Sequence, residues 1–121
     1  MNNYTAATVE GFVTHEPIMR KTKNGKVLCL FSVAINHYSA PDTPPRVSYL
    51  DVETWERFAD VCAKHVSKGK RVMVMGSLRQ DRWEGKDGKM QSKIIMVGRE
   101  IRFLDSGRVE KETEMKASDR L

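Results

Sequence analysis

The sequence predicts an all-β domain with one short helix, and three observations carry this prediction. Apolar residues alternate with polar ones in several short segments, which is the pattern of half-buried strands. One segment, between Phe58 and Val66, repeats its apolar residues at helical spacing instead. Turn signals rich in Gly, Asn or Pro separate the segments. With 121 residues, 40% of them apolar, the chain is long enough to form one domain with its own core.

The first two predicted strands flank an Asn-Gly turn. Residues 9–13 alternate in polarity before Pro17 breaks the pattern, so we expect the first strand to end near Thr14. Asn24-Gly25 predicts a tight hairpin turn, because these two residues readily adopt positive φ angles. The second strand is the apolar run VLCLFSVAI that follows the turn.

A proline-rich loop and the helix follow. Three of the four prolines lie in NHYSAPDTPPRV, and proline removes the N–H that a strand ladder needs, so this segment is predicted to be a loop. The third strand runs from Val47 to about Trp55. The helix of about three turns follows, with Gly69 as its stop signal.

Two more strands complete the predicted domain. KRVMVMGSL alternates, so we expect Val72, Val74 and Leu78 to share the buried face. EGKDGK predicts a turn, and MQSKIIMV with EIRFL supplies the last strand. Three strands, one helix and two strands is the order of an OB-fold, a five-stranded, partly open Greek-key barrel that binds oligonucleotides or oligosaccharides.

The charge of the chain is unevenly distributed. The formal net charge is +5, with 17 basic and 11 acidic residues up to Leu104 against 4 and 5 after it. We therefore predict a basic OB-fold domain over residues 1–104 and a polar tail over 105–121, which is expected to be disordered or a short frayed helix. Basic residues cluster in MRKTKNGK and between Arg79 and Lys93, and clustered basic charge on loops favours a polyanionic partner.

Aromatic residues fall on the outer face of the predicted sheet. Leu50 and Val52 share one parity and are expected to face the core, which leaves Tyr49 and Trp55 on the opposite face among charged residues. By the same alternation Arg71, Arg79 and Trp83 point outward from the fourth strand. Aromatics between cationic side chains form a stacking platform for nucleic-acid bases. The alternatives are that Trp55 begins the helix and packs on the core, and that Tyr49 and Trp83 lie in a subunit contact.

No pattern in the sequence predicts an enzyme, a metal site or a cofactor. His15, His37 and His65 lack the spacing of a zinc site, and GKDGK is too short for a phosphate-binding loop. Cys29 and Cys62 lie in apolar stretches, and we expect both to be buried, reduced thiols. No apolar run reaches the length of a membrane span and no secretory signal is present, so a cytoplasmic protein is expected.

Several motifs in order resemble the bacterial single-stranded DNA-binding protein family. They are V-x-G-x-V-x-x-E-P-x-x-R at residues 9–20, FSVAIN, ETWERFADVCAKHVSKGKRVMVMGSL, and the following RW and DGK. The resemblance covers nearly all of residues 5–104. It implies an OB-fold that wraps single-stranded DNA, assembles as a homotetramer, and protects strands exposed in replication, recombination and repair.

The resemblance also implies site residues. The stacking aromatics of the family correspond to Tyr49, Trp55 and Trp83, and Tyr38 near the proline-rich loop is a further stacking candidate. Its basic contacts correspond to Arg20, Arg71 and Arg79. Together with the basic clusters noted above, the predicted phosphate contacts are Arg20, Lys21, Lys23, Lys26, Arg71, Arg79, Arg82, Lys86, Lys89 and Lys93.

The sequence departs from the family pattern at three places. A Trp that is common near the end of the second strand is absent, with His37, Tyr38 and Ser39 in its neighbourhood, and Thr5 replaces the usual Asn. The family tail ends in an acidic tip that recruits repair enzymes, whereas this sequence ends in EMKASDRL, so recruitment by that route is not expected. An alternative function therefore stays open, a primosome-type module that contacts other proteins, and RNA would fit the same stacking surface.

Overall fold

The computed structural model describes residues 3–105, 108–109 and 115–116, with burial described up to residue 104. The elements in chain order are β1 (Ala7–Val13), β2 (Ile18–Lys21), β3 (Val27–His37), β4 (Arg46–Trp55), α1 (Glu56–His65), β5 (Arg71–Glu84), β6 (Met90–Asp105), β7 (Arg108–Val109) and β8 (Met115–Lys116).

The sheet closes on itself to form a partly open barrel. Its order is β1-β5-β6-β4-β3-β2, and β1 also pairs with β3, which closes the ring. Two seams are short. β1 meets β3 only through Phe12 and Val13, and the parallel β4–β6 pairing is limited to Val52 and Glu53 on the β4 side. With α1 between β4 and β5, this confirms the predicted OB-fold.

The first barrel strand is split, which the sequence analysis did not predict. The strand ends at Val13, close to the expected end near Thr14, but the chain resumes as β2 after Pro17 and pairs with residues 27–30 of β3. The four residues of β2 are all exposed. Because burial does not alternate along β2, no hydrophobic periodicity marks it in the sequence.

The predicted turns are present. Gly25 has a φ of +82°, and its N–H donates to the Thr22 carbonyl at 2.9 Å, so the Asn24-Gly25 hairpin turn is confirmed. Gly88 has a φ of +80° in the turn between β5 and β6. The proline-rich segment 38–45 carries no helix or strand, as expected.

Helix α1 covers one end of the barrel and completes its core. Phe58, Val61 and Cys62 are buried, as their helical spacing predicts. They pack in one cluster with barrel residues that include Phe31 and Met96. The helix ends at His65, and Gly69, with a φ of +89°, lies in the turn that leads to β5 rather than at the helix end.

A bulge bends the β5–β6 ladder, and beyond it one burial prediction is wrong. Met75 pairs with Glu100 but Gly76 pairs with Gly98, so Arg99 is an extra residue on β6. Val72 and Val74 are fully buried before the bulge, whereas Leu78 is 40% exposed beyond it. The physical reason is that the ladder continues to Glu84 and Met90, past the part of the sheet that the core covers.

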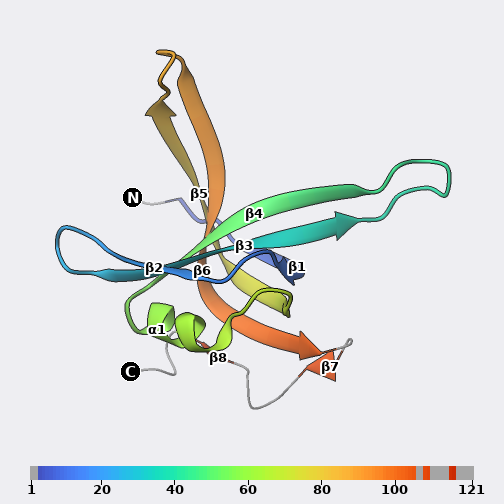
Figure 1. Ribbon diagram of the computed structural model, residues 1–121, viewed down its shortest axis with the longest axis horizontal. Helices are drawn as coiled ribbons and strands as arrows, with labels where there is room; N and C mark the ends of the chain where they lie inside the picture. Colours follow the sequence, from blue (N-terminus) through green and yellow to red (C-terminus); the bar gives the residue numbers. More distant parts are fainter. Residues whose placement is uncertain (1–2, 106–107, 110–114, 117–121) are drawn as a thin grey trace.

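Three hairpins extend from the barrel in different directions (Figure 1). The first is the β2–β3 turn, the second is the β3–β4 arm that ends in the proline-rich loop, and the third is the β5–β6 arm. The third arm stands well apart from the other two in Figure 1. The barrel therefore presents three separate tips around a common base.

The predicted tail lies largely outside the described residues. Residues 106–107, 110–114 and 117–121 are not described, so the expectation of a disordered tail or a frayed helix is not tested there. The described parts are two short strands, β7 and β8, each paired with β6. Among the described residues, no helix is both long and apolar enough to cross a membrane.

Candidate nucleic-acid interface

The alternation predicted for β4 is present. Val52 and Thr54 are fully buried, whereas Tyr49 is 69% exposed on the opposite face. Leu50 is partly buried and packs against the core. Stacking on bases requires an exposed aromatic ring, and Tyr49 provides one among charged residues.

The exposed faces of β4, β5 and β6 form one continuous surface. Arg79 on β5 donates to Glu53 on β4 at 2.8 and 2.9 Å, and Lys93 on β6 forms an ion pair with Asp51 on β4. Since β6 lies between β5 and β4 in the sheet, Arg79 crosses over β6 to reach Glu53. We call the surface formed by Tyr49, Asp51, Glu53, Trp55, Arg79, Asp81, Trp83 and Lys93 the outer face.

Trp83 lies near the tip of the β5–β6 arm. Trp83 lies on the same face of β5 as Arg79 and Asp81, and it is 46% exposed. Its cross-strand partner is Gln91. The arm therefore carries one large aromatic ring about 13 Å along the strand from Arg79, at about 3.3 Å per residue.

Trp55 occupies the junction between β4 and α1, where it is partly buried. Its backbone is extended, with φ −122° and ψ 149°, and the next residue, Glu56, has a φ of +59°. A positive φ outside glycine costs about 1–3 kcal/mol, and such strained residues cluster at active sites and ligand-binding sites. Trp55 therefore stands directly before the helix, as one of the two alternatives expected, and its side chain is neither fully buried nor fully exposed.

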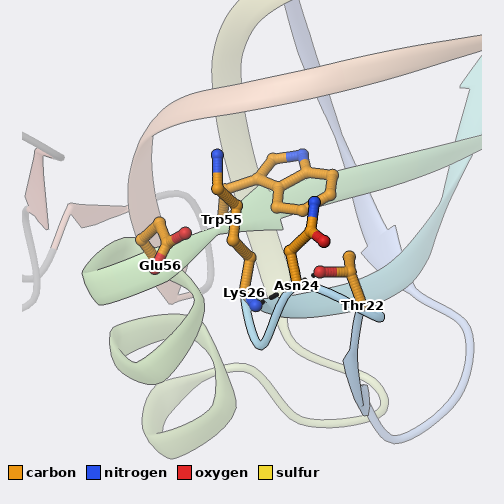
Figure 2. A pocket seen from close by; sticks show the side chains of 5 residues that line it. All are labelled: Thr22, Asn24, Lys26, Trp55 and Glu56. Atoms are coloured by element: carbon orange, nitrogen blue, oxygen red, sulfur yellow. Dashed lines mark hydrogen bonds between the residues drawn. The ribbon is translucent and has the colours of Figure 1, made fainter.

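A pocket of about 400 Å³ opens beside Trp55, lined by this residue, Thr22, Asn24, Lys26 and Glu56. Figure 2 shows the Lys26 side chain running beside the indole ring, with Asn24 and Thr22 on the other side of the pocket. The β2–β3 turn supplies three of these residues, Thr22, Asn24 and Lys26. The Lys26 N–H donates to Thr22 Oγ1 at 3.2 Å, and this bond holds the turn closed. A cation and an aromatic ring thus line one pocket.

Tyr38 lies at the far end of the β3–β4 arm and is 94% exposed. It lines a second pocket, of about 540 Å³, together with Pro44, Pro45 and Arg46. His37, next to it, has its Nε2 2.7 Å from Ser48 Oγ across the arm. Tyr38 therefore lies with the proline-rich loop, beyond the last ladder pair of the arm, His37 and Arg46.

The predicted basic residues fall into two groups. Seven are exposed and form no ion pair with another described residue: Arg20, Lys21, Lys23, Lys26, Arg82, Lys86 and Lys89. They gather on the β2–β3 turn and on the β5–β6 arm. Unpaired cations on projecting turns can approach phosphates without losing an existing partner.

The remaining three are held by carboxylates. Arg71 forms an ion pair with Glu10 at the start of β5, at the opposite end of the strand from Trp83. Lys93 is paired with Asp51, as described above. Arg79 donates from Nε to Asp81 Oδ1 at 2.7 Å in addition to its two bonds to Glu53. These bonds to Asp81 and Glu53 raise the pKa of the Arg79 guanidinium, and the bond from Arg79 lowers the pKa of Asp81.

Two residues contribute to this surface beyond the predicted site residues. Glu53 accepts a hydrogen bond from the Trp55 indole Nε1 at 2.7 Å. Asn24 was noted only for its turn, although it lines the Trp55 pocket. A glutamate two residues before a tryptophan on one strand shares its face, which was the signal for Glu53.

The part of the chain that the structure describes carries no candidate metal site. No group of three or more His, Cys, Asp or Glu side chains could hold a metal ion among those residues. Cys29 and Cys62 are both free and buried, so the prediction of buried, reduced thiols is confirmed.

The closed sheet and its helix define the chain as an OB-fold domain, a class whose members bind oligonucleotides or oligosaccharides. A model of the Single-strand binding protein family matches residues 4–104. The chain therefore belongs to this family, as its motifs indicated. The names of its relatives are those of binding proteins, in agreement with the prediction that the chain is not an enzyme.

Two relatives illustrate the similarity. The "Single-stranded DNA-binding protein" of Treponema pallidum is 37% identical over 98 residues, which are 79% of this chain and 55% of that protein. "Single-stranded DNA-binding protein 1" of Synechocystis is 31% identical over 107 residues, which are 87% of each chain. This chain thus spans just over half the length of the first relative and most of the second.

A solved structure has the same fold. The Plasmodium falciparum SSB, in a complex with ssDNA, superposes with a TM-score of 0.76 over 87% of this chain and 98% of that one. The sequence identity is 21%. This likeness supports the OB-fold independently of the strand order.

Proposed function

We propose that this chain binds single-stranded DNA with little sequence preference, as a non-enzymatic protein that protects exposed strands. One observation carries the proposal: the aromatic rings of Tyr49, Trp55 and Trp83 lie on the outer face, between turns that carry unpaired cations. Each base has a π-face, so stacking tolerates any sequence. Membership of the Single-strand binding protein family supports the same function.

In this proposal the two kinds of residue have separate roles. Tyr49, Trp55 and Trp83 stack on bases along the outer face, and Tyr38 stacks on a base at the β3–β4 tip. Arg20, Lys21, Lys23 and Lys26 contact phosphates from the β2–β3 side, and Arg82, Lys86 and Lys89 do so from the β5–β6 arm. Release of counterions by these cations makes the affinity fall as salt rises.

The cellular context follows from the family. We propose a role in replication, recombination and repair, a cytoplasmic location with the nucleoid, and assembly as a homotetramer. Light scattering on the purified chain tests the assembly, and a mass four times that of the 13.8 kDa chain is expected. A monomeric mass would contradict it.

Replacing Trp83 tests the binding mode. Trp83→Ala removes one stacking surface, so the affinity for oligo(dT) is expected to weaken by about 1–3 kcal/mol in an equilibrium titration. The matched control is Tyr4→Ala, which removes an aromatic ring that is 89% exposed ahead of β1, and it should leave the affinity within twofold of the parent. Unchanged affinity in Trp83→Ala would favour a module that contacts other proteins through this aromatic.

A further inference from the structure

The outer face carries three negatively charged side chains, Asp51, Glu53 and Asp81. Among these three, Glu53 accepts the most hydrogen bonds. Its Oε1 accepts a hydrogen bond from Trp55 Nε1 at 2.7 Å and one from Arg79 Nη1 at 2.8 Å. Its Oε2 accepts from Arg79 Nη2 at 2.9 Å. The Glu53 side chain is 12% exposed, against 44% for Arg79, so the carboxylate lies beneath the arginine that covers it.

The bond to Trp55 determines how the indole ring is oriented. The indole N–H is the only polar group of a tryptophan side chain, and it is a donor only. With this donor held by Glu53, the ring cannot turn about its side-chain bonds without breaking a bond to a charged acceptor. The ring is therefore held where it lines the pocket with Asn24 and Lys26, and a base that stacks on it does not have to order it first.

The bonds to Arg79 remove this arginine from the set of available cations. Glu53 engages two of its nitrogens and Asp81 engages Nε and Nη2. If a phosphate bound Arg79 in place of Glu53, the mostly buried Glu53 carboxylate would lose its ion pair and would lie close to the negative phosphate. An unpaired, poorly solvated charge is more costly than the loss of an exposed ion pair, which is worth about 0–1 kcal/mol.

We infer that Glu53 is a positioning residue of the DNA-binding face: one carboxylate orients Trp55 for stacking and holds Arg79 away from phosphates. This inference rests on the proposed function. It revises the sequence-based prediction that Arg79 contacts phosphate directly, because Arg79 acts through Glu53 instead. Arg79 then contributes to the shape of the face and not to the salt dependence of binding.

Glu53→Gln tests the hold on Arg79. The amide oxygen can still accept the Trp55 N–H, but the more buried of the two carboxylates that hold Arg79 has lost its charge. The remaining ion pair with Asp81 is exposed, and an exposed pair is worth only about 0–1 kcal/mol, so a phosphate can take Arg79 from it. The affinity for oligo(dT) at low salt should rise, and the slope of log K against log salt should steepen by about 0.7, the value for one extra phosphate contact on a single strand. Adding Arg79→Gln should return the slope to that of the parent, because the freed cation has been removed.

Glu84→Gln is the matched control for charge. Glu84 is exposed near the tip of the same arm, and it forms no ion pair with another described residue. It removes the same single charge without releasing an arginine, so its salt slope should equal that of the parent. A parental slope in Glu53→Gln, or an equal change in Glu84→Gln, would overturn the inference.

Fluorescence tests the hold on Trp55. Trp55 and Trp83 are the only tryptophans, so Trp83→Phe leaves Trp55 as the single reporter. In this background Glu53→Ala should lose at least half of the quenching by saturating oligo(dT), and Glu53→Gln should retain it. Equal quenching in all three would overturn the inference, with circular dichroism showing that each is folded. Failure of the parent chain to bind oligo(dT) at all would contradict the proposed function itself.

Discussion

Cys29 and Cys62 lie in the barrel core, one on β3 and the other on α1, and both are fully buried. Burial raises the pKa of Cys29 to about 11 and the pKa of Cys62 to about 12, from an ordinary value of 9.0. A thiol attacks electrophiles as the thiolate. Both residues are therefore packing groups in the native protein, not redox sensors.

Thiol labelling checks this at the residue level. At pH 8 the native chain is expected to leave both cysteines unlabelled by a disulfide reagent over the time in which the urea-unfolded chain labels both. The contrast arises because unfolding restores both access and the ordinary pKa. Rapid labelling of the native chain would show that the α1–barrel contact opens readily.

The same shifts predict how stability depends on alkaline pH. Well below pH 9.0 both thiols are protonated in the folded and unfolded states, so their ionisation favours neither state. As the pH rises from 9.0 toward 11 and 12, the unfolded thiols ionise first, and the free energy of unfolding falls. Urea titrations between pH 8 and 11 measure this. The double variant Cys29→Ala and Cys62→Ala should lose less stability over that range than the parent.

Much of the residue-level picture could be predicted from the sequence. Alternation along β4 sufficed to place Tyr49 on the outer face, because the buried parity is marked by Val52. The contact between Glu53 and Arg79 could not be predicted, since it depends on β6 lying between two strands that are distant in sequence. The local periodicity of a strand does not show which distant strands lie beside it in a barrel.

Gly11 allows β1 to approach β3 closely at the short seam that closes the barrel. A Cβ on Gly11 would lie 2.2 Å from the carbonyl oxygen of Ala34 and 2.5 Å from Val33 Cγ1. Both neighbours belong to β3, where β1 meets it through a short seam. No rotation of a flexible side chain can relieve the contact with a backbone oxygen, so β1 would have to move.

Gly11→Ala is therefore expected to destabilise the chain by about 1–3 kcal/mol, the usual cost of overpacking a tight contact. Urea unfolding followed by circular dichroism measures it. The control is Gly85→Ala, where the nearest atom to the new Cβ is Asp87 Oδ1 at 3.1 Å, the end of a flexible side chain, and little change is expected. Parental stability in Gly11→Ala would show that the β1–β3 seam is not needed for folding.

At the element scale the sequence predicted the types of element better than their lengths. The helix and the turns were found because glycines and helical spacing are local signals. The split of the first strand and the exposure of Leu78 were not, because both depend on where the barrel ends. Beyond the bulge at Arg99 a strand can continue with the same alternation and no longer have a core to cover.

The described part of the molecule is a barrel that presents three hairpins. The seven predicted phosphate contacts that form no ion pair with another described residue lie on two of them, on the β2–β3 side and on the β5–β6 arm. Replacing Lys23 and Lys26 with Gln should reduce the slope of log K against log salt for oligo(dT) by about 1.4, at about 0.7 per phosphate contact. The reason is that two counterion-releasing contacts are lost at the β2–β3 turn, next to Trp55.

Lys64→Gln with Lys68→Gln is the control for this change. It removes two positive charges as well, one from Lys64 near the end of α1 and one from Lys68 in the loop that follows. Both lysines are exposed. The slope is expected to remain that of the parent. An equal decrease in both double variants would mean that net charge, and not the β2–β3 turn, determines the salt dependence.

The central claim is that single strands bind by stacking on the outer face, and a tryptophan-fluorescence titration with oligo(dT) tests it most directly. The titration is repeated at two salt concentrations and against a duplex of equal length. We expect tight quenching by the single strand alone, weaker at the higher salt. The absence of quenching, or equal binding of the duplex, would contradict the account and make Trp55 and Trp83 residues of a protein interface.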